Sequence, residues 1–111
     1  MIVELDVFSG RPNPRWQLDE AGAAELSDLH HHLEVAAARP TEPPGLGYRG
    51  FLYSLDGVPW RAWHGFVTSG DRTLADGSRA IERLLLAGLP EEHAYLRPAI
   101  GGEIEGLGGL S

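Results

Sequence analysis

The sequence predicts a compact α+β domain: a mostly antiparallel sheet with a central β-hairpin and two main helices packed on one of its faces. Three observations lead to this prediction. Residues 2–7 alternate apolar and acidic side chains, a pattern typical of a half-buried strand. Asp56 and Gly57 join two strand-like segments, which is a strong hairpin signal. Two further segments, one after Asp19 and one after Asp76, repeat apolar residues at helical spacing.

Length and composition indicate one ordered domain. The chain has 111 residues, of which 42% are hydrophobic, and this is enough for one modest core. We expect the domain to cover residues 1–100 and the glycine-rich, acidic residues 101–111 to form a mobile tail. No apolar run approaches the ~20 residues that span a bilayer. Glu4 and Asp6 interrupt any signal-like segment at the N-terminus, so we expect a cytoplasmic protein.

The residue types that the chain lacks restrict its chemistry. There is no cysteine, which excludes a thiol nucleophile and cysteine-ligated metals. All nine basic residues are arginine, so no lysine can form a Schiff base or carry pyridoxal phosphate. A formal net charge of −7 argues against nucleic acid or an anionic membrane as a partner. We therefore predict no cofactor and no metal.

The segment Phe8–Trp16 is the most specialised part of the chain. One glycine and two prolines restrict its backbone, so a stiff loop should follow the first strand. Polar residues on a rigid loop often bind ligands. The predicted ligand-binding residues of this loop are Arg11, Asn13, Arg15 and Trp16. The alternative is a purely structural loop, in which Trp16 fills the core and Arg11 pairs with Asp6 or Glu4.

Asp19 is a typical helix N-cap, and we expect the helix that follows to run to about Ala38 and to stop before Pro40. Its buried stripe would consist of Gly22, Leu26, Leu29, Leu33 and Ala36. Three consecutive histidines, residues 30–32, point in three directions on a helix and cannot share one metal ion. Residues 40–47 are rich in proline and glycine, so we expect an exposed connection there.

The register of the hairpin follows from its turn. A type I′ turn at Asp56 and Gly57 has two residues, so opposite positions are fixed along the strands 48–55 and 58–67. The predicted pairs are Leu55 with Val58, Tyr53 with Trp60, Phe51 with Ala62, and Arg49 with His64. On the other face, Trp63 would cover Gly50, as an aromatic ring covers a strand glycine.

Arg49 and His64 are the candidate catalytic residues, because this register places them together at the open end of the hairpin. A histidine titrates near neutral pH and can act as a general acid or base. The arginine can hold a carboxylate or an enolate oxygen. Tyr53 and Trp60 lie on the same predicted face and would form an apolar wall. The alternative is that this face packs under the helices, with the arginine and the histidine at its wet margin.

The remaining chain predicts a short strand and a second helix. Residues 68–75 are typical of a turn followed by a strand. Asp76 or Ser78 can cap a helix that carries a stripe of apolar residues and ends at Gly88-Leu89-Pro90. Residues 91–96 are expected to add one or two helical turns before Pro98.

Together, these residues favour a small-molecule site between the loop and the open end of the hairpin, for an anionic or carbonyl-containing ligand. If the site catalyses a reaction, we expect cofactor-free acid/base chemistry such as cyclisation or isomerisation. The alternative is a non-enzymatic domain that binds a protein partner or forms a homodimer, because tryptophan, tyrosine and arginine are enriched in protein interfaces.

Overall fold

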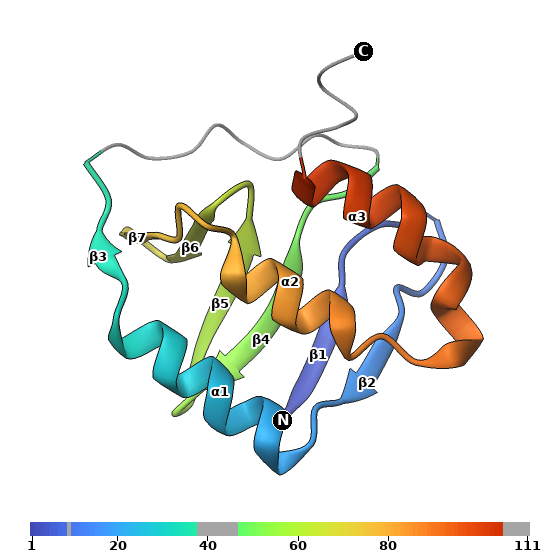
Figure 1. Ribbon diagram of the computed structural model, residues 1–111, viewed down its shortest axis with the longest axis horizontal. Coiled ribbons are helices and arrows are strands. Elements are labelled where there is room, and N and C mark those ends of the chain that lie inside the picture. The colour runs from blue at the N-terminus through green and yellow to red at the C-terminus, as the bar shows by residue number, and fades with distance from the viewer. Residues whose placement is uncertain (9, 38–46, 106–111) are drawn as a thin grey trace.

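The computed structural model describes residues 1–8, 10–37 and 47–105. These residues form one antiparallel sheet of seven strands, three α-helices and one 3-10 helix (Figure 1). The strands are β1 (Ile2–Leu5), β2 (Arg15–Gln17), β3 (Glu34–Val35), β4 (Phe51–Leu55), β5 (Val58–Trp63), β6 (Phe66–Ser69) and β7 (Arg72–Ala75). The helices are α1 (Glu20–His31), α2 (Ala80–Ala87), the 3-10 helix η1 (Glu91–Leu96) and α3 (Arg97–Glu105). This architecture confirms the predicted α+β class.

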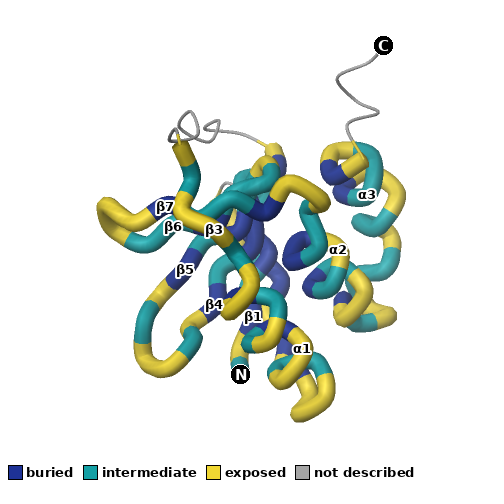
Figure 2. The backbone as a smooth tube through the Cα atoms, turned by 60° about the vertical axis from the view of Figure 1, so that its left-hand side comes forward, coloured by how far each residue is buried: buried dark blue, intermediate teal, exposed yellow. Residues whose placement is uncertain are grey.

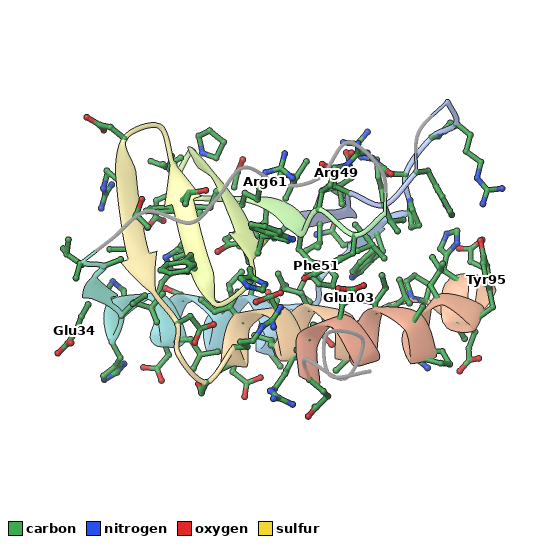
Figure 3. All side chains as sticks on the ribbon, turned by 90° about the horizontal axis from the view of Figure 1, so that it is seen from above. Glu34, Arg49, Phe51, Arg61, Tyr95 and Glu103 are labelled. Carbon is green, nitrogen blue, oxygen red and sulfur yellow. The ribbon has the colours of Figure 1, made fainter. Side chains whose placement is uncertain are left out.

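The sheet has the strand order β2-β1-β4-β5-β6-β7-β3, and the predicted hairpin β4–β5 lies near its centre. All three α-helices lie on one side of the sheet, and the side chain of Arg61 projects from the opposite side (Figure 3). None of the described helices covers that second face. The fold therefore consists of a helical layer, a core and an open sheet face.

The core lies between the helical layer and the sheet. Alternate strand residues point into it, and the dark segments of β1, β4 and β5 in Figure 2 are these buried positions. The strands contribute Val3, Leu5, Trp16, Phe51, Tyr53, Trp60, Ala62 and Val67, and the helices contribute Leu26, Ile81, Leu85, Ile100 and Ile104. The residues between them on the strands point to the open face.

The predicted hairpin register is confirmed from Phe51, opposite Ala62, to Leu55, opposite Val58. Asp56 and Gly57 have φ angles of 52° and 79°, as both central residues of a type I′ turn require. Gly50 has a φ of 101°, and a β-carbon there would lie only 2.8 Å from Cβ of Trp63. Trp63 therefore lies directly against Gly50, while the position of its ring over the glycine stays a prediction.

The second hairpin strand is shorter than predicted. β5 ends at Trp63, and the chain reverses at His64 and Gly65, whose φ angles are 56° and 82°. These two residues form a second two-residue turn, which pairs Trp63 with Phe66 in β6. The prediction that Arg49 faces His64 is therefore wrong, because both residues lie outside the β4–β5 ladder.

Helix α1 ends earlier than predicted. Asp19 caps its start by accepting a hydrogen bond from the backbone N–H of Gly22 at 2.7 Å, but the helix stops at His31 and not near Ala38. The chain then becomes extended because residues 34 and 35 pair with the free edge of β7 as β3. Residues 38–46 lie outside the described part of the chain, and with them most of the predicted 40–47 connection.

The C-terminal part contains one more helix than predicted. Pro98 lies in the first turn of α3, where its missing N–H is not needed, so it starts a helix rather than ending one. The helix continues to Glu105 and buries Ile104, so the boundary expected after residue 100 falls inside a helix. Residues 106–111 of the predicted tail lie outside the described residues.

Candidate functional site

Asn13 organises the loop after β1. Its Oδ1 accepts hydrogen bonds from the backbone N–H groups of Val7 at 3.0 Å and Phe8 at 2.7 Å. Its Nδ2 donates to Glu4 Oε2 at 3.1 Å and to Asp6 Oδ1 at 3.3 Å. The side chain thus uses its acceptor and both donors inside the protein, and its role in the structure is to hold the loop against β1.

Trp16 and Arg11, two further predicted ligand contacts, lie in different surroundings. Trp16 is 7% exposed on the helical side of the sheet, and its ring meets that of Phe51 edge-on with centroids 6.3 Å apart. Arg11 is exposed, and its guanidinium carbon lies 3.7 Å above the ring of Phe8. The alternative of a structural loop predicted correctly that Trp16 fills the core. It also predicted that Arg11 pairs with Asp6 or Glu4, whereas Arg11 stacks on the ring of Phe8.

Asp6 is the centre of a charged network at the start of this loop. Its Oδ1 accepts from Arg49 Nε at 3.0 Å and lies 2.7 Å from Arg49 Nη2, and its Oδ2 accepts from Arg61 Nη1 at 2.8 Å. Burial alone raises the pKa of Asp6, but the hydrogen bonds and charges of Arg61 and Arg49 outweigh it and hold this pKa below its ordinary value. The carboxylate therefore stays ionised and fixes both guanidinium groups.

Arg49 and Arg61 are engaged to different degrees. Arg49 also donates from Nη2 to the backbone carbonyl of Phe8 at 2.8 Å, so it closes the loop. Arg61 makes both of its hydrogen bonds through Nη1, to Asp6 and to the carbonyl of Arg49 at 2.6 Å. Among the described residues, nothing accepts a hydrogen bond from its Nε or Nη2. Nη1 of this guanidinium is thus held by the protein, and the edge formed by Nε and Nη2 is available for a ligand.

Arg61 lines an open groove of about 600 Å³ on the uncovered sheet face. Ile2, Leu52 and Pro59 give the groove an apolar floor, and Ser54 and Thr68 add hydroxyl groups. Glu4 and Arg15 form its other charged border, with Arg15 Nε 3.4 Å from Glu4 Oε1. Arg15 is thus a predicted ligand-binding residue that is exposed and lines this groove.

Tyr53 and Trp60 border the groove but point mainly into the core, where they are 4% and 6% exposed. The hydroxyl of Tyr53 lies 2.6 Å from Nε2 of His30, and the His30 and Trp60 ring centroids are 5.0 Å apart. Burial lowers the pKa of His30, which keeps this ring neutral. The rings of the predicted apolar wall therefore pack against helix α1, and their contact with a ligand stays a prediction.

His64 lies away from this groove. It is exposed in the turn between β5 and β6, and its ring lies 5.0 Å from that of Trp63. The arrangement on which the predicted acid/base pair depended, two residues facing each other across one ladder, is not formed. Catalysis by Arg49 and His64 stays a prediction without that geometric support.

A second charged cluster is fully satisfied and structural. Glu82 in α2 is 1% exposed; its Oε1 accepts from the Tyr48 hydroxyl at 2.5 Å and its Oε2 accepts from the Gly65 N–H at 2.9 Å. Arg79 donates to both oxygens at 3.0 Å. Burial alone raises the pKa of Glu82, but these hydrogen bonds outweigh it and lower the pKa. The cluster joins α2 to the β5–β6 turn.

Sequence reasoning missed Asp6 and Arg61 as the centre of the site. The signal was present in the hairpin register, which places Arg61 on the same face as Leu52, Ser54 and Pro59. The attraction between Asp6 and two arginines more than forty residues away was not visible in any local pattern.

Two further properties of the described residues bear on the site. No group of three or more histidine, cysteine, aspartate or glutamate side chains in residues 1–8, 10–37 and 47–105 is arranged to hold a metal ion. Within the same residues, no helix has the length and apolar character needed to cross a membrane. No protein-family model, curated protein or solved structure matches this chain.

Proposed function

We propose that the protein is a small-molecule-binding domain that holds a carboxylate group on the open face of its sheet. The observation that supports this most strongly is that Arg61 borders a groove of about 600 Å³ and uses only its Nη1 in hydrogen bonds to the described residues, which leaves its Nε–Nη2 edge for a ligand. A guanidinium edge of this kind matches the two oxygens of a carboxylate and forms two parallel hydrogen bonds.

The side chain of Arg61 is preorganised for binding a carboxylate. Its Nη1 is held by Asp6 and by the carbonyl of Arg49, and its side chain is 31% exposed. Less side-chain freedom is therefore lost on binding than for an unrestrained arginine. Each charge-assisted hydrogen bond contributes about 1.5–3 kcal/mol, which is sufficient for a weak carboxylate site on its own.

The distribution of charge favours an anion on this face. Residues 1–18 and 47–75, which form the loop and most of the sheet, carry five arginines and four carboxylates. Residues 19–37 and 76–105, which include the helical layer, carry three arginines and eleven carboxylates. Although the protein is acidic overall, its field directs an anionic ligand away from the helices and toward the open sheet face.

Substitution of Arg61 by lysine tests this proposal. Lysine keeps a positive charge beside Asp6 but loses the planar fork, so R61K should fold normally and bind carboxylates at least several-fold more weakly. The probes are acetate, benzoate and succinate, titrated into ¹⁵N-labelled protein and followed by NMR chemical shifts. R83K is the matched control, because Arg83 is an exposed arginine paired with Glu105 in the helical layer.

The expected result is saturable shifts of open-face residues in the wild type and in R83K, and much weaker binding in R61K. Equal affinity of all three proteins for every probe contradicts the proposal. Shifts confined to the helical layer contradict it as well, because the ligand would then bind elsewhere.

A protein interface on the same face is the second candidate. The observation that favours it is the apolar floor of the groove, where Ile2 is 47% exposed although its strand β1 has a paired strand on each side. In that case a protein partner, or a second copy of the chain in a homodimer, would cover the open face. Light scattering coupled to gel filtration measures the homodimer directly, and Ile2→Glu should abolish it while leaving the monomer folded.

A further inference from the structure

Four side chains form a straight row across the open face. Arg15 is the cross-strand partner of Glu4, Glu4 is the partner of Leu52, and Leu52 is the partner of Arg61. Cross-strand partners lie on the same face of a sheet, so the row presents a positive, a negative, an apolar and a positive side chain in order. All four border the groove in which we place the carboxylate.

Glu4 in this row has acceptor capacity left. Its side chain is 30% exposed, and its Oε2 accepts one hydrogen bond, from Asn13 Nδ2 at 3.1 Å. Its Oε1 lies 3.4 Å from Arg15 Nε, which is an ion pair but longer than an ordinary N–H···O hydrogen bond. A carboxylate has about four acceptor positions, so Glu4 can receive a further donor from the groove side.

Glu4 and Arg61 are close enough to contact one small ligand. They lie on strands β1 and β5, with only β4 between them. Neighbouring strands are roughly 4.8 Å apart, so the two backbones are separated by roughly 10 Å. Their side chains also share neighbours: Asn13 Nδ2 lies 3.1 Å from Glu4 Oε2 and 3.3 Å from Asp6 Oδ1, and Asp6 Oδ2 lies 2.8 Å from Arg61 Nη1. The two charges are therefore held near the same carboxylate, on one side of the sheet.

We infer that the ligand is a zwitterion, an apolar α-amino acid, whose carboxylate binds Arg61 and whose ammonium group binds Glu4. This inference rests on the proposed carboxylate site. The charge order of the row supports it, because a negative and a positive ligand group meet opposite charges on either side of Leu52. The apolar side chain of the ligand would lie on the floor formed by Leu52 and Pro59.

The experiment compares L-leucine with N-acetyl-L-leucine, which keeps the carboxylate and the side chain but has no ammonium group. The wild type should bind L-leucine about tenfold more tightly, a ratio typical of one added charged contact. E4Q should bind L-leucine as weakly as N-acetyl-L-leucine, while its affinity for the acetylated probe is unchanged. Glutamine retains an oxygen for Asn13, so the loop should stay in place.

E105Q is the matched control, since Glu105 is also an exposed carboxylate paired with an arginine, but it lies in α3. It should retain the preference for L-leucine. R61K should weaken binding of both probes, because both use the carboxylate.

The outcomes separate the two proposals. If the acetylated probe binds as tightly as L-leucine and R61K weakens both, the zwitterion inference is wrong and the carboxylate site stands. If E4Q keeps the full preference for L-leucine, Glu4 does not bind the ammonium group and the inference fails. If neither probe binds the wild type, the carboxylate site and the zwitterion inference both fail.

Discussion

Asp6→Asn tests the network that holds Arg61 in position. Asp6 is buried, with a side-chain exposure of 12%, and it binds two arginines through separate oxygens. Asparagine keeps one carbonyl oxygen, but its NH₂ group would point a donor at one of the guanidinium groups. The variant therefore loses at least one charge-assisted hydrogen bond and leaves an arginine without its counter-charge.

The expected loss follows from this geometry. Removing one partner of a buried ion pair costs about 3–5 kcal/mol. Arg49 and Arg61 are 21% and 31% exposed, so water partly replaces the lost partner. We therefore expect a decrease of about 2–3 kcal/mol in the free energy of unfolding, which corresponds to a decrease of roughly 10–20 °C in Tm for a domain of this size.

The assay is urea unfolding of the wild type and D6N at pH 7, followed by circular dichroism, with E105Q as a surface control. The dependence on pH provides a second check. The pKa of Asp6 is lowered from 3.8 in the folded protein, so its contribution is complete above that value and is lost as the pH falls toward the folded pKa. The difference between wild type and D6N should accordingly shrink below pH 3.8. A difference at pH 7 no larger than that of E105Q would refute this account of the network.

Two further predictions concern residues outside the groove. Burial lowers the pKa of His30 from 6.5, so the unfolded chain binds the proton first as the pH falls. The free energy of unfolding should therefore decrease as the pH drops below 6.5 toward the folded pKa. His30→Gln should flatten this pH dependence in urea titrations, and an unchanged dependence would contradict the prediction. His64→Asn places asparagine at a turn position with a φ of 56°, so it should stabilise the protein by about 0.5 kcal/mol, whereas Gly65→Ala should destabilise it, both measured by urea unfolding. A loss of stability in H64N would contradict the turn.

Local patterns in the sequence predicted the hairpin well. The register of β4 and β5 depends on the two-residue turn at Asp56 and Gly57, and both residues are adjacent in the chain. The N-cap at Asp19 is likewise a local feature. For α2 the prediction is correct only in part: the N-cap residue is Arg79 and not Asp76 or Ser78, but the Asp76 side chain accepts from the N–H groups of residues 80 and 81 at 3.2 and 2.9 Å. These features require no information from distant segments.

Features that depend on distant partners could not be predicted in this way. The conversion of residues 34 and 35 into β3 depends on the free edge of β7, about forty residues later, and nothing local marks it. The second turn was missed because histidine is a less common first residue of a type I′ turn than asparagine or aspartate. The contact between the loop and the hairpin was predicted only in part for a related reason, since Arg49 does reach the loop, but through Asp6 and beside Arg61, and not together with His64.

The most direct measurement of the central claim is the NMR signal of the Arg61 Nε–H group during a titration with benzoate. If the guanidinium edge binds a carboxylate, this signal should shift downfield in a saturable manner and exchange more slowly with water. The corresponding signal of Arg83, which lies in the helical layer, should not move. An Arg61 signal that stays unchanged while benzoate binds, or that moves no more than that of Arg83, would contradict the claim.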